Sequence, residues 1–263
     1  MAAINAYLSD LMADPAHRYT ASELTIHAAL CQRFTALMTL SDQNVREYGC
    51  SLDWVAPGNL TACIPRFDGP ASGTAVDLQT LAERQRAAYI GGFHTHPYVT
   101  KYGPGIGIGP SNGDWMEWWL RPPTGPTVAA QFVASGGQLF LIVFRNRPAG
   151  AISQNNVTSD TQRLNDAVRN WPEREQVAYG DAQGRHDWAT LRTLLQRNSP
   201  RVMAQHQADA HQMNCDMAYA NGAEYYKGPL NNGPSTLTLA SNRVLGNYLT
   251  STFWTHSSSP WFG

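Results

Sequence analysis

The sequence predicts an α/β fold over residues 1–153, followed by a mostly helical and irregular extension over residues 154–263. Segments in which apolar residues recur at steps of three and four, typical of helices, stand among segments in which apolar and polar residues alternate, typical of strands. The chain has 43% hydrophobic residues, enough to bury a core. Residues 158–220 are polar with a helical pattern, and the last forty residues are rich in Ser, Asn, Gly and Thr. We therefore place a domain boundary near residue 153, with the role of the extension open.

Two helices are expected first, over residues 3–13 and 22–40. The second carries apolar residues at steps of three and four, and Ser22 is placed to cap its first turn. A strand is expected over residues 47–55, which alternate and include aromatic residues. A Pro-Gly turn then leads into a second strand over residues 60–65.

The following elements surround an irregular loop. In order, they are a polar helix over 76–87, a strand over 89–94, a Gly/Pro-rich loop over 102–110, a helix over 111–120, and a hairpin of strands 128–134 and 138–144. Pro122 and Pro123 end the helix because proline has no amide hydrogen to donate. Two glycines after Ser135 favour the hairpin turn.

Composition and charge exclude several classes of protein. The net charge is −1, so no basic surplus exists to neutralise phosphates and we expect no nucleic acid partner. No window approaches the roughly 18 apolar residues of a membrane span, and the N-terminus lacks a basic region followed by an apolar core. We expect a protein made in the cytoplasm without a signal peptide. The four cysteines lie far apart, which excludes a four-cysteine zinc knuckle.

The most informative pattern is His94-Thr-His96-Pro97, followed later by Ser111-Asn-Gly-Asp114. Two histidines at i and i+2 in an extended chain point to the same side, so both rings can reach one ion. Asp114 would add a carboxylate oxygen from the first turn of the next helix. Three protein ligands leave a fourth position for water, as a catalytic zinc requires.

Each half of this pattern also has a purely structural interpretation. A His-x-His pair at a strand end occurs without any metal. Ser111-x-x-Asp114 matches a helix capping box, in which Ser111 caps and Asp114 reaches back. The two halves together, with Pro97 and a Gly-rich loop between them, favour a site.

This pattern resembles the motif of JAMM (MPN-type) metalloproteases, in which His-x-His-Pro is followed by Ser-x-x-Asp. Those proteins also use a glutamate on the strand after the first long helix, where Glu47-Tyr-Gly49 stands here. The sequence Arg46-Glu-Tyr-Gly49 further resembles that of a bacterial, Prok-JAB-like branch of the family. Domains of this branch are found at the ends of polymorphic toxins and in effectors of contact-dependent secretion systems. The resemblance covers residues 20–150.

The resemblance implies the JAMM (cytidine-deaminase-like) fold, a curved, mixed and largely antiparallel sheet flanked by helices. It implies that three residues hold Zn²⁺, namely His94, His96 and Asp114. Glu47 would act as general base on the attacking water and then give the proton to the leaving amine, and Ser111 would hydrogen-bond the oxyanion. The expected activity is that of a zinc-dependent peptidase or isopeptidase, in a bacterial effector or toxin.

Two features depart from the family pattern. The spacer over residues 98–110 is longer than usual, and its glycines and prolines would absorb the excess. Glu83 competes with Glu47 as the base, because it is nearer in sequence to the histidines. We prefer Glu47 because it precedes a strand pattern, whereas Glu83 lies in a polar helix.

The expected partner is a protein or peptide substrate. A ubiquitin-like conjugate, a protein tail and a cell-wall peptide cross-link all contain amides that one such site would hydrolyse. Residues 154–263 would present a surface to the substrate, to a delivery protein or to an immunity protein. Export would use a contact-dependent secretion system that needs no cleaved signal.

Two other functions compete with this hypothesis. A non-catalytic MPN-fold scaffold or interaction module would have no need of the metal ligands, and their retention argues against it. A deaminase-like zinc enzyme is disfavoured because the cysteines do not form a Pro-Cys-x-x-Cys pattern.

Overall fold

The computed structural model describes residues 1–14, 19–55, 58–62, 66–67, 86–97, 107–111, 114–115, 128–145, 166–185 and 187–242. The strands are β1 (Ala2–Ala3), β2 (Glu23–Ile26), β3 (Tyr48–Val55), β4 (Asn59–Ala62), β5 (Arg66–Phe67), β6 (Tyr89–His96), β7 (Ala129–Ser135), β8 (Gln138–Phe144), β9 (Ala223–Pro229) and β10 (Ser235–Asn242). The helices are α1 (Ile4–Ala13), α2 (Ala28–Asn44), α7 (Glu173–Gly184), α8 (Trp188–Asn198) and α9 (Val202–Ala220).

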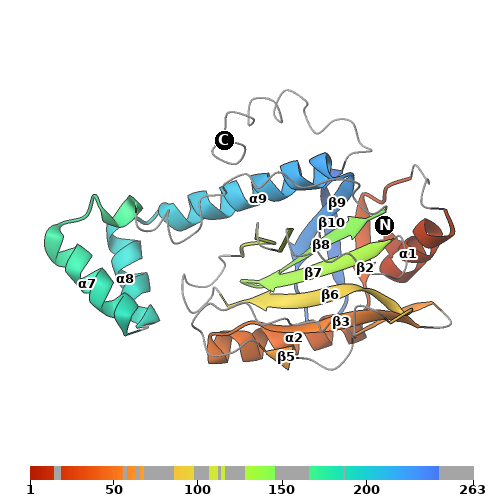
Figure 1. Cartoon of the computed structure of the whole chain (residues 1–263), viewed down its shortest axis with the longest axis horizontal. Helices are drawn as coiled ribbons and strands as arrows, with labels where there is room; N and C mark the ends of the chain where they lie inside the picture. The colour runs from red at the N-terminus through yellow and green to blue at the C-terminus, as the bar shows by residue number, and fades with distance from the viewer. Residues whose placement is uncertain are drawn as a thin grey trace.

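The strands of the described residues form one mixed sheet in the order β1-β2-β10-β9-β8-β7-β6-β3-β4, with β5 paired to β3. Strands β6 and β7 run parallel, as do β1 and β2, and the remaining pairs are antiparallel. Figure 1 shows the sheet curled, with helices on both sides. The expected α/β class, with a mixed sheet flanked by helices, is confirmed.

Alternation along the central strands gives the sheet two apolar faces. On β8, Leu139 and Leu141 belong to the core cluster that includes α1 and α2. Their neighbours Phe140 and Ile142 belong to a second cluster, built with residues of α9. Helices α2 and α9 therefore cover opposite faces, and the strands between them are buried on both sides.

The prediction of a helix over residues 22–40 is wrong about where the helix begins. Residues 23–26 form β2, and α2 begins only at Ala28. Its N-cap is His27 rather than Ser22, since His27 Nδ1 accepts the Leu30 amide hydrogen at 3.3 Å. The reason is that β2 pairs along its whole length with β10, and this long-range pairing outweighs the local helical pattern.

The C-terminal region requires a larger correction. Helices α7, α8 and α9 lie within the segment that carries the helical pattern. Residues 223–242, however, are not irregular: they form β9 and β10, which stand between β8 and β2. The boundary near residue 153 does not divide the sheet, because the pair β9 and β10 from after this boundary is inserted between strands from before it.

A buried polar cluster joins α1 to β9 and to the end of β8. Glu224 of β9 is 1% exposed and accepts hydrogen bonds from the Tyr7 hydroxyl of α1 at 2.7 Å and the Tyr226 hydroxyl at 2.8 Å. The same carboxylate pairs with Arg145, directly after β8. A buried charge requires such partners, so this cluster links α1 to the centre of the sheet.

Several other expectations can be placed. The strands expected over residues 47–55 and 89–94 and the hairpin after residue 128 are confirmed as β3, β6 and β7–β8. Most of the helix expected over 76–87 and most of the helix expected over 111–120 lie outside the described residues. Among the helices of the described residues, none is long and apolar enough to cross a membrane.

Candidate metal centre

The two histidines of the motif lie at the end of β6, which has β7 on one side and β3 on the other. Strand alternation turns the residue between them, Thr95, toward α2, where its hydroxyl donates to Ser41 Oγ at 2.7 Å. His94 and His96 consequently face the opposite side of the sheet. Both are buried, with exposed fractions of 7% and 3%.

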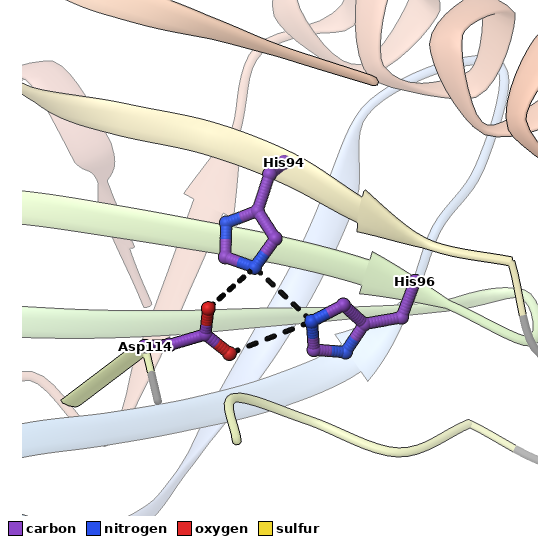
Figure 2. Close-up of side chains that lie close together, drawn as sticks. All are labelled: His94, His96 and Asp114. Atoms are coloured by element: carbon purple, nitrogen blue, oxygen red, sulfur yellow. Dashed lines mark hydrogen bonds and ion pairs between the residues drawn. The ribbon is translucent and has the colours of Figure 1, made fainter. Parts of the chain in front are cut away.

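The two rings converge with the carboxylate of Asp114 (Figure 2). The Nε2 atoms of His94 and His96 lie 3.1 Å apart. Asp114 Oδ1 lies 3.0 Å from His94 Nε2, and Asp114 Oδ2 lies 3.4 Å from His96 Nε2. Each residue thus offers one ligand atom, all within 4.8 Å of one another, and this group could hold a metal ion.

The ring of His96 is oriented by a backbone carbonyl. His96 Nδ1 lies 3.3 Å from the oxygen of Ile108. Because a carbonyl can only accept, Nδ1 carries the hydrogen, and in the neutral ring Nε2 presents its lone pair. The amide of Ile108 donates in turn to Ser135 Oγ at 3.2 Å, which holds the carbonyl in place.

Asp114 fits both the capping-box interpretation and the metal-ligand interpretation of its motif. Its Oδ2 accepts hydrogen bonds from the Ser111 amide at 2.6 Å and the Ser111 hydroxyl at 2.8 Å. Ser111 Oγ also accepts the Asp114 amide hydrogen at 3.2 Å, which completes a capping box. The cap therefore fixes the carboxylate in the orientation that faces the two rings.

Glu47 reaches the site from the start of β3, the strand that pairs antiparallel with β6. Strand β3 pairs Gly49 with His94, and Glu47 stands two residues before Gly49. Its Oε1 lies 3.9 Å from His96 Nε2, and its side chain is 38% exposed. Glu47 thus borders the site on a side that solvent reaches. Its competitor Glu83 lies outside the described residues.

Backbone anchors on both sides hold Glu47 in this place. The Tyr48 amide donates to Thr95 Oγ1 at 2.9 Å, Thr95 donates to Ser41 Oγ, and Ser41 donates to the Arg46 carbonyl at 2.7 Å. Hydrogen bonds in such a chain polarise and strengthen one another. Thr95, between the two histidines, therefore orients the segment that carries Glu47.

The charges of the site favour a cation. Burial acts to lower the pKa of His96, but the hydrogen bond and charge of Asp114, followed by the charge of Glu47, raise this pKa to about 9. Burial acts to raise the pKa of Asp114, and the charges and hydrogen bonds of His94 and His96 hold it well below its usual range. Positive charge between the rings is stabilised by both carboxylates.

The structure brings all five sequence-predicted site residues together: Glu47, His94, His96, Ser111 and Asp114. Sequence reasoning missed Thr95 and the carbonyl of Ile108. The alternation of β6 could have identified Thr95 as a residue facing the first helix. A loop carbonyl carries no side-chain signal, so nothing in the sequence marks Ile108.

Comparisons of the chain with protein-family models, with curated proteins and with solved structures found no match. The JAMM resemblance accordingly rests on the motif residues alone.

Proposed function

We propose that this chain is a zinc-dependent peptidase or isopeptidase of the JAMM (MPN) type, and that it acts as a bacterial effector or toxin. One observation carries the proposal: two imidazole nitrogens and a carboxylate converge at a strand end, with a second carboxylate beside them. His94, His96 and Asp114 form the ligand group, and Glu47 is the second carboxylate.

The donor set fits zinc. Two nitrogens bound to a tetrahedral zinc at the usual bond length stand roughly 3.3 Å apart. The separation of 3.1 Å between the Nε2 atoms of His94 and His96 is close to that value, and the oxygens of Asp114 lie at 3.0 and 3.4 Å from these nitrogens. Bound there, zinc would act as a Lewis acid and lower the pKa of a water ligand to about 7.

The residues of the chain would perform the proton transfers. Glu47 is partly exposed beside His96, where its carboxylate can take a proton from the attacking water and give it to the leaving amine. The Ser111 hydroxyl donates to Asp114 Oδ2. Rotation about its Cα–Cβ bond would turn this hydroxyl toward the oxyanion of the tetrahedral intermediate.

The proposed substrate contains an amide bond that the site would hydrolyse. A ubiquitin-like conjugate, a protein tail and a cell-wall peptide cross-link all fit a metal-assisted hydrolysis with Glu47 as base. A delivery protein or an immunity protein would be further partners of a secreted effector.

A non-catalytic MPN-fold scaffold is the second candidate. The observation in its favour is the capping box, because Ser111 and Asp114 satisfy each other without any ion. In a scaffold the convergence of both histidines on Asp114 would have no function.

Zinc content tests the proposal. Elemental analysis should find one zinc per chain in the wild type and none in the His94→Ala/His96→Ala double variant, because the double variant keeps only one of three ligands. Glu47→Gln should keep its zinc and lose hydrolysis of a peptide or ubiquitin-like conjugate library by a factor of about 10²–10⁴. The matched control is Glu23→Gln, which changes a half-buried glutamate at the start of β2.

Two results would count against this function. A folded wild type that takes up no zinc after incubation with the metal would support the scaffold. A Glu47→Gln variant that cleaves as fast as Glu23→Gln would remove Glu47 from the mechanism.

A further inference from the structure

Helix α9 lies along the segment that brings Asp114 to the site. This 107–111 segment contains the Ile108 carbonyl, which orients His96, and Ser111, which caps Asp114. Three hydrogen bonds join α9 to this segment and to the helical residues that follow it. The helix belongs to the region that the sequence predicts to be an extension separate from the site.

Asn214 makes two of these hydrogen bonds with a fully buried side chain. Its Nδ2 donates to the Pro110 carbonyl at 2.9 Å and to the Ala210 carbonyl of its own helix at 2.8 Å. Its Oδ1 accepts the indole hydrogen of Trp115 at 2.8 Å. One amide therefore holds the chain on both sides of the capping box, at Pro110 before Ser111 and at Trp115 after Asp114.

Gln207 makes the third hydrogen bond, at the N-terminal end of the 107–111 segment. Its Nε2 donates to the Gly107 carbonyl at 2.9 Å. Gly107 lies so close to the turn after β7 that a Cβ there would stand 2.7 Å from the Ser135 carbonyl oxygen. The neighbouring Ile108 belongs to an apolar cluster with residues of α7, α8 and α9, so the carbonyl that orients His96 is held from several directions.

We propose that Asn214 and Gln207 are positioning residues for the metal ligands, with Asn214 setting the place of Asp114 and Gln207 that of the Ile108 carbonyl. The inference rests on the proposed function, because it assigns these amides a role toward the same metal. It makes α9 a part of the site. Loss of either amide leaves all three ligands in the chain but removes a contact that fixes where they stand.

The test is the affinity of the full chain for Zn²⁺ alone, measured by competition with a chelator, together with the visible absorption of the Co²⁺ form. Asn214→Ala should weaken Zn²⁺ binding by about 10- to 100-fold and change the intensity of the Co²⁺ bands, which follows coordination geometry. Gln207→Ala should weaken binding by a smaller factor. Leu30→Ala is the control: it destabilises α2 on the other face of the sheet and should leave affinity and spectrum unchanged.

The outcomes separate this inference from the proposed function. Wild-type affinity and spectrum in Asn214→Ala, with zinc lost in His94→Ala/His96→Ala, would overturn the inference and leave the zinc site standing. If the wild type itself binds no Zn²⁺, both fail. Should Asn214→Ala not fold, Gln207→Ala decides, and an unchanged affinity there would overturn the inference.

Discussion

Asp114 uses its two carboxylate oxygens differently. Oδ1 faces His94, whereas Oδ2 faces His96 and also accepts both hydrogen bonds from Ser111. A short acidic side chain at the third position of a helix is held by the cap whether or not a metal is present. The cap thus orients the ligand before binding, which reduces the ordering cost of binding.

Replacement of Ser111 separates its capping role from its role toward the substrate. Ser111→Ala should lower the free energy of unfolding by about 1 kcal/mol through loss of the cap. If the hydroxyl also stabilises the oxyanion, kcat should fall by about 10²–10³. Urea unfolding and steady-state kinetics on the same preparations would measure both effects.

The matched control is Asp187→Ala, which removes the N-cap of α8: the Asp187 side chain accepts the Thr190 amide hydrogen at 3.1 Å. It should lose similar stability and keep its kcat. A Ser111→Ala variant that also keeps its kcat would leave Ser111 with the capping role only.

At the scale of elements, α9 joins the sheet through a mixed apolar and polar face. His211 of this helix is half-buried, with Nδ1 3.5 Å from the Tyr225 hydroxyl and Nε2 3.9 Å from Cys215 Sγ. Burial, followed by the charge of Lys227, lowers the pKa of His211 to about 4. The folded chain therefore holds this ring neutral where an unfolded chain would begin to protonate it.

This pKa predicts an acid-sensitive contact between α9 and β9. The folded pKa lies below the unfolded value of about 6.5, so the stability from neutral His211 is fully present above pH 6.5 and is lost as the pH falls toward 4. The slope should stay below about 1.4 kcal/mol per pH unit, because one ring takes up at most one proton on unfolding, and solvent screening of the partly exposed ring reduces the total loss.

Urea unfolding of wild type and His211→Gln between pH 4 and 7.5 would measure this contribution as a difference, in which other titrating groups cancel. The variant should lose less stability in this window. Lys227→Met should show an intermediate dependence, because it removes the second cause of the shift. Parallel curves for wild type and His211→Gln would contradict the prediction.

At the scale of the molecule, one sheet takes its strands from both sides of residue 153. Strands β9 and β10 stand between β8 and β2, so a chain cut at residue 153 would leave one edge of β8 and one edge of β2 unpaired and lose the α9 side of the core. Unpaired edges and an uncovered apolar face lead to aggregation. We therefore expect residues 1–153 alone to show no cooperative unfolding and no zinc binding.

Circular dichroism during urea titration would measure this for the 1–153 fragment. Co-expression with a 154–263 fragment should restore both the cooperative transition and the zinc, since the missing strands are then supplied in trans. A 1–153 fragment that unfolds cooperatively by itself would instead support a domain boundary at residue 153.

Those parts of the site that depend on neighbouring residues could be predicted from the sequence. The period of two in a strand places His94 and His96 on one side, and the capping box relates Ser111 to Asp114. The hairpin of β7 and β8 and the helices after residue 166 follow from turn residues and helical periodicity in the same way. Each of these signals arises within one turn or one hairpin, so the sequence by itself determined them.

Only the tertiary structure decided the features that join distant parts of the chain. The sequence predicts a helix for residues 23–26 and irregular chain for residues 223–242, because short strands carry little periodicity. These strands form because they pair with one another and with β8. The same holds for Asn214, whose contacts lie about a hundred residues away. Contacts at that separation depend on the whole fold, and no local pattern encodes them.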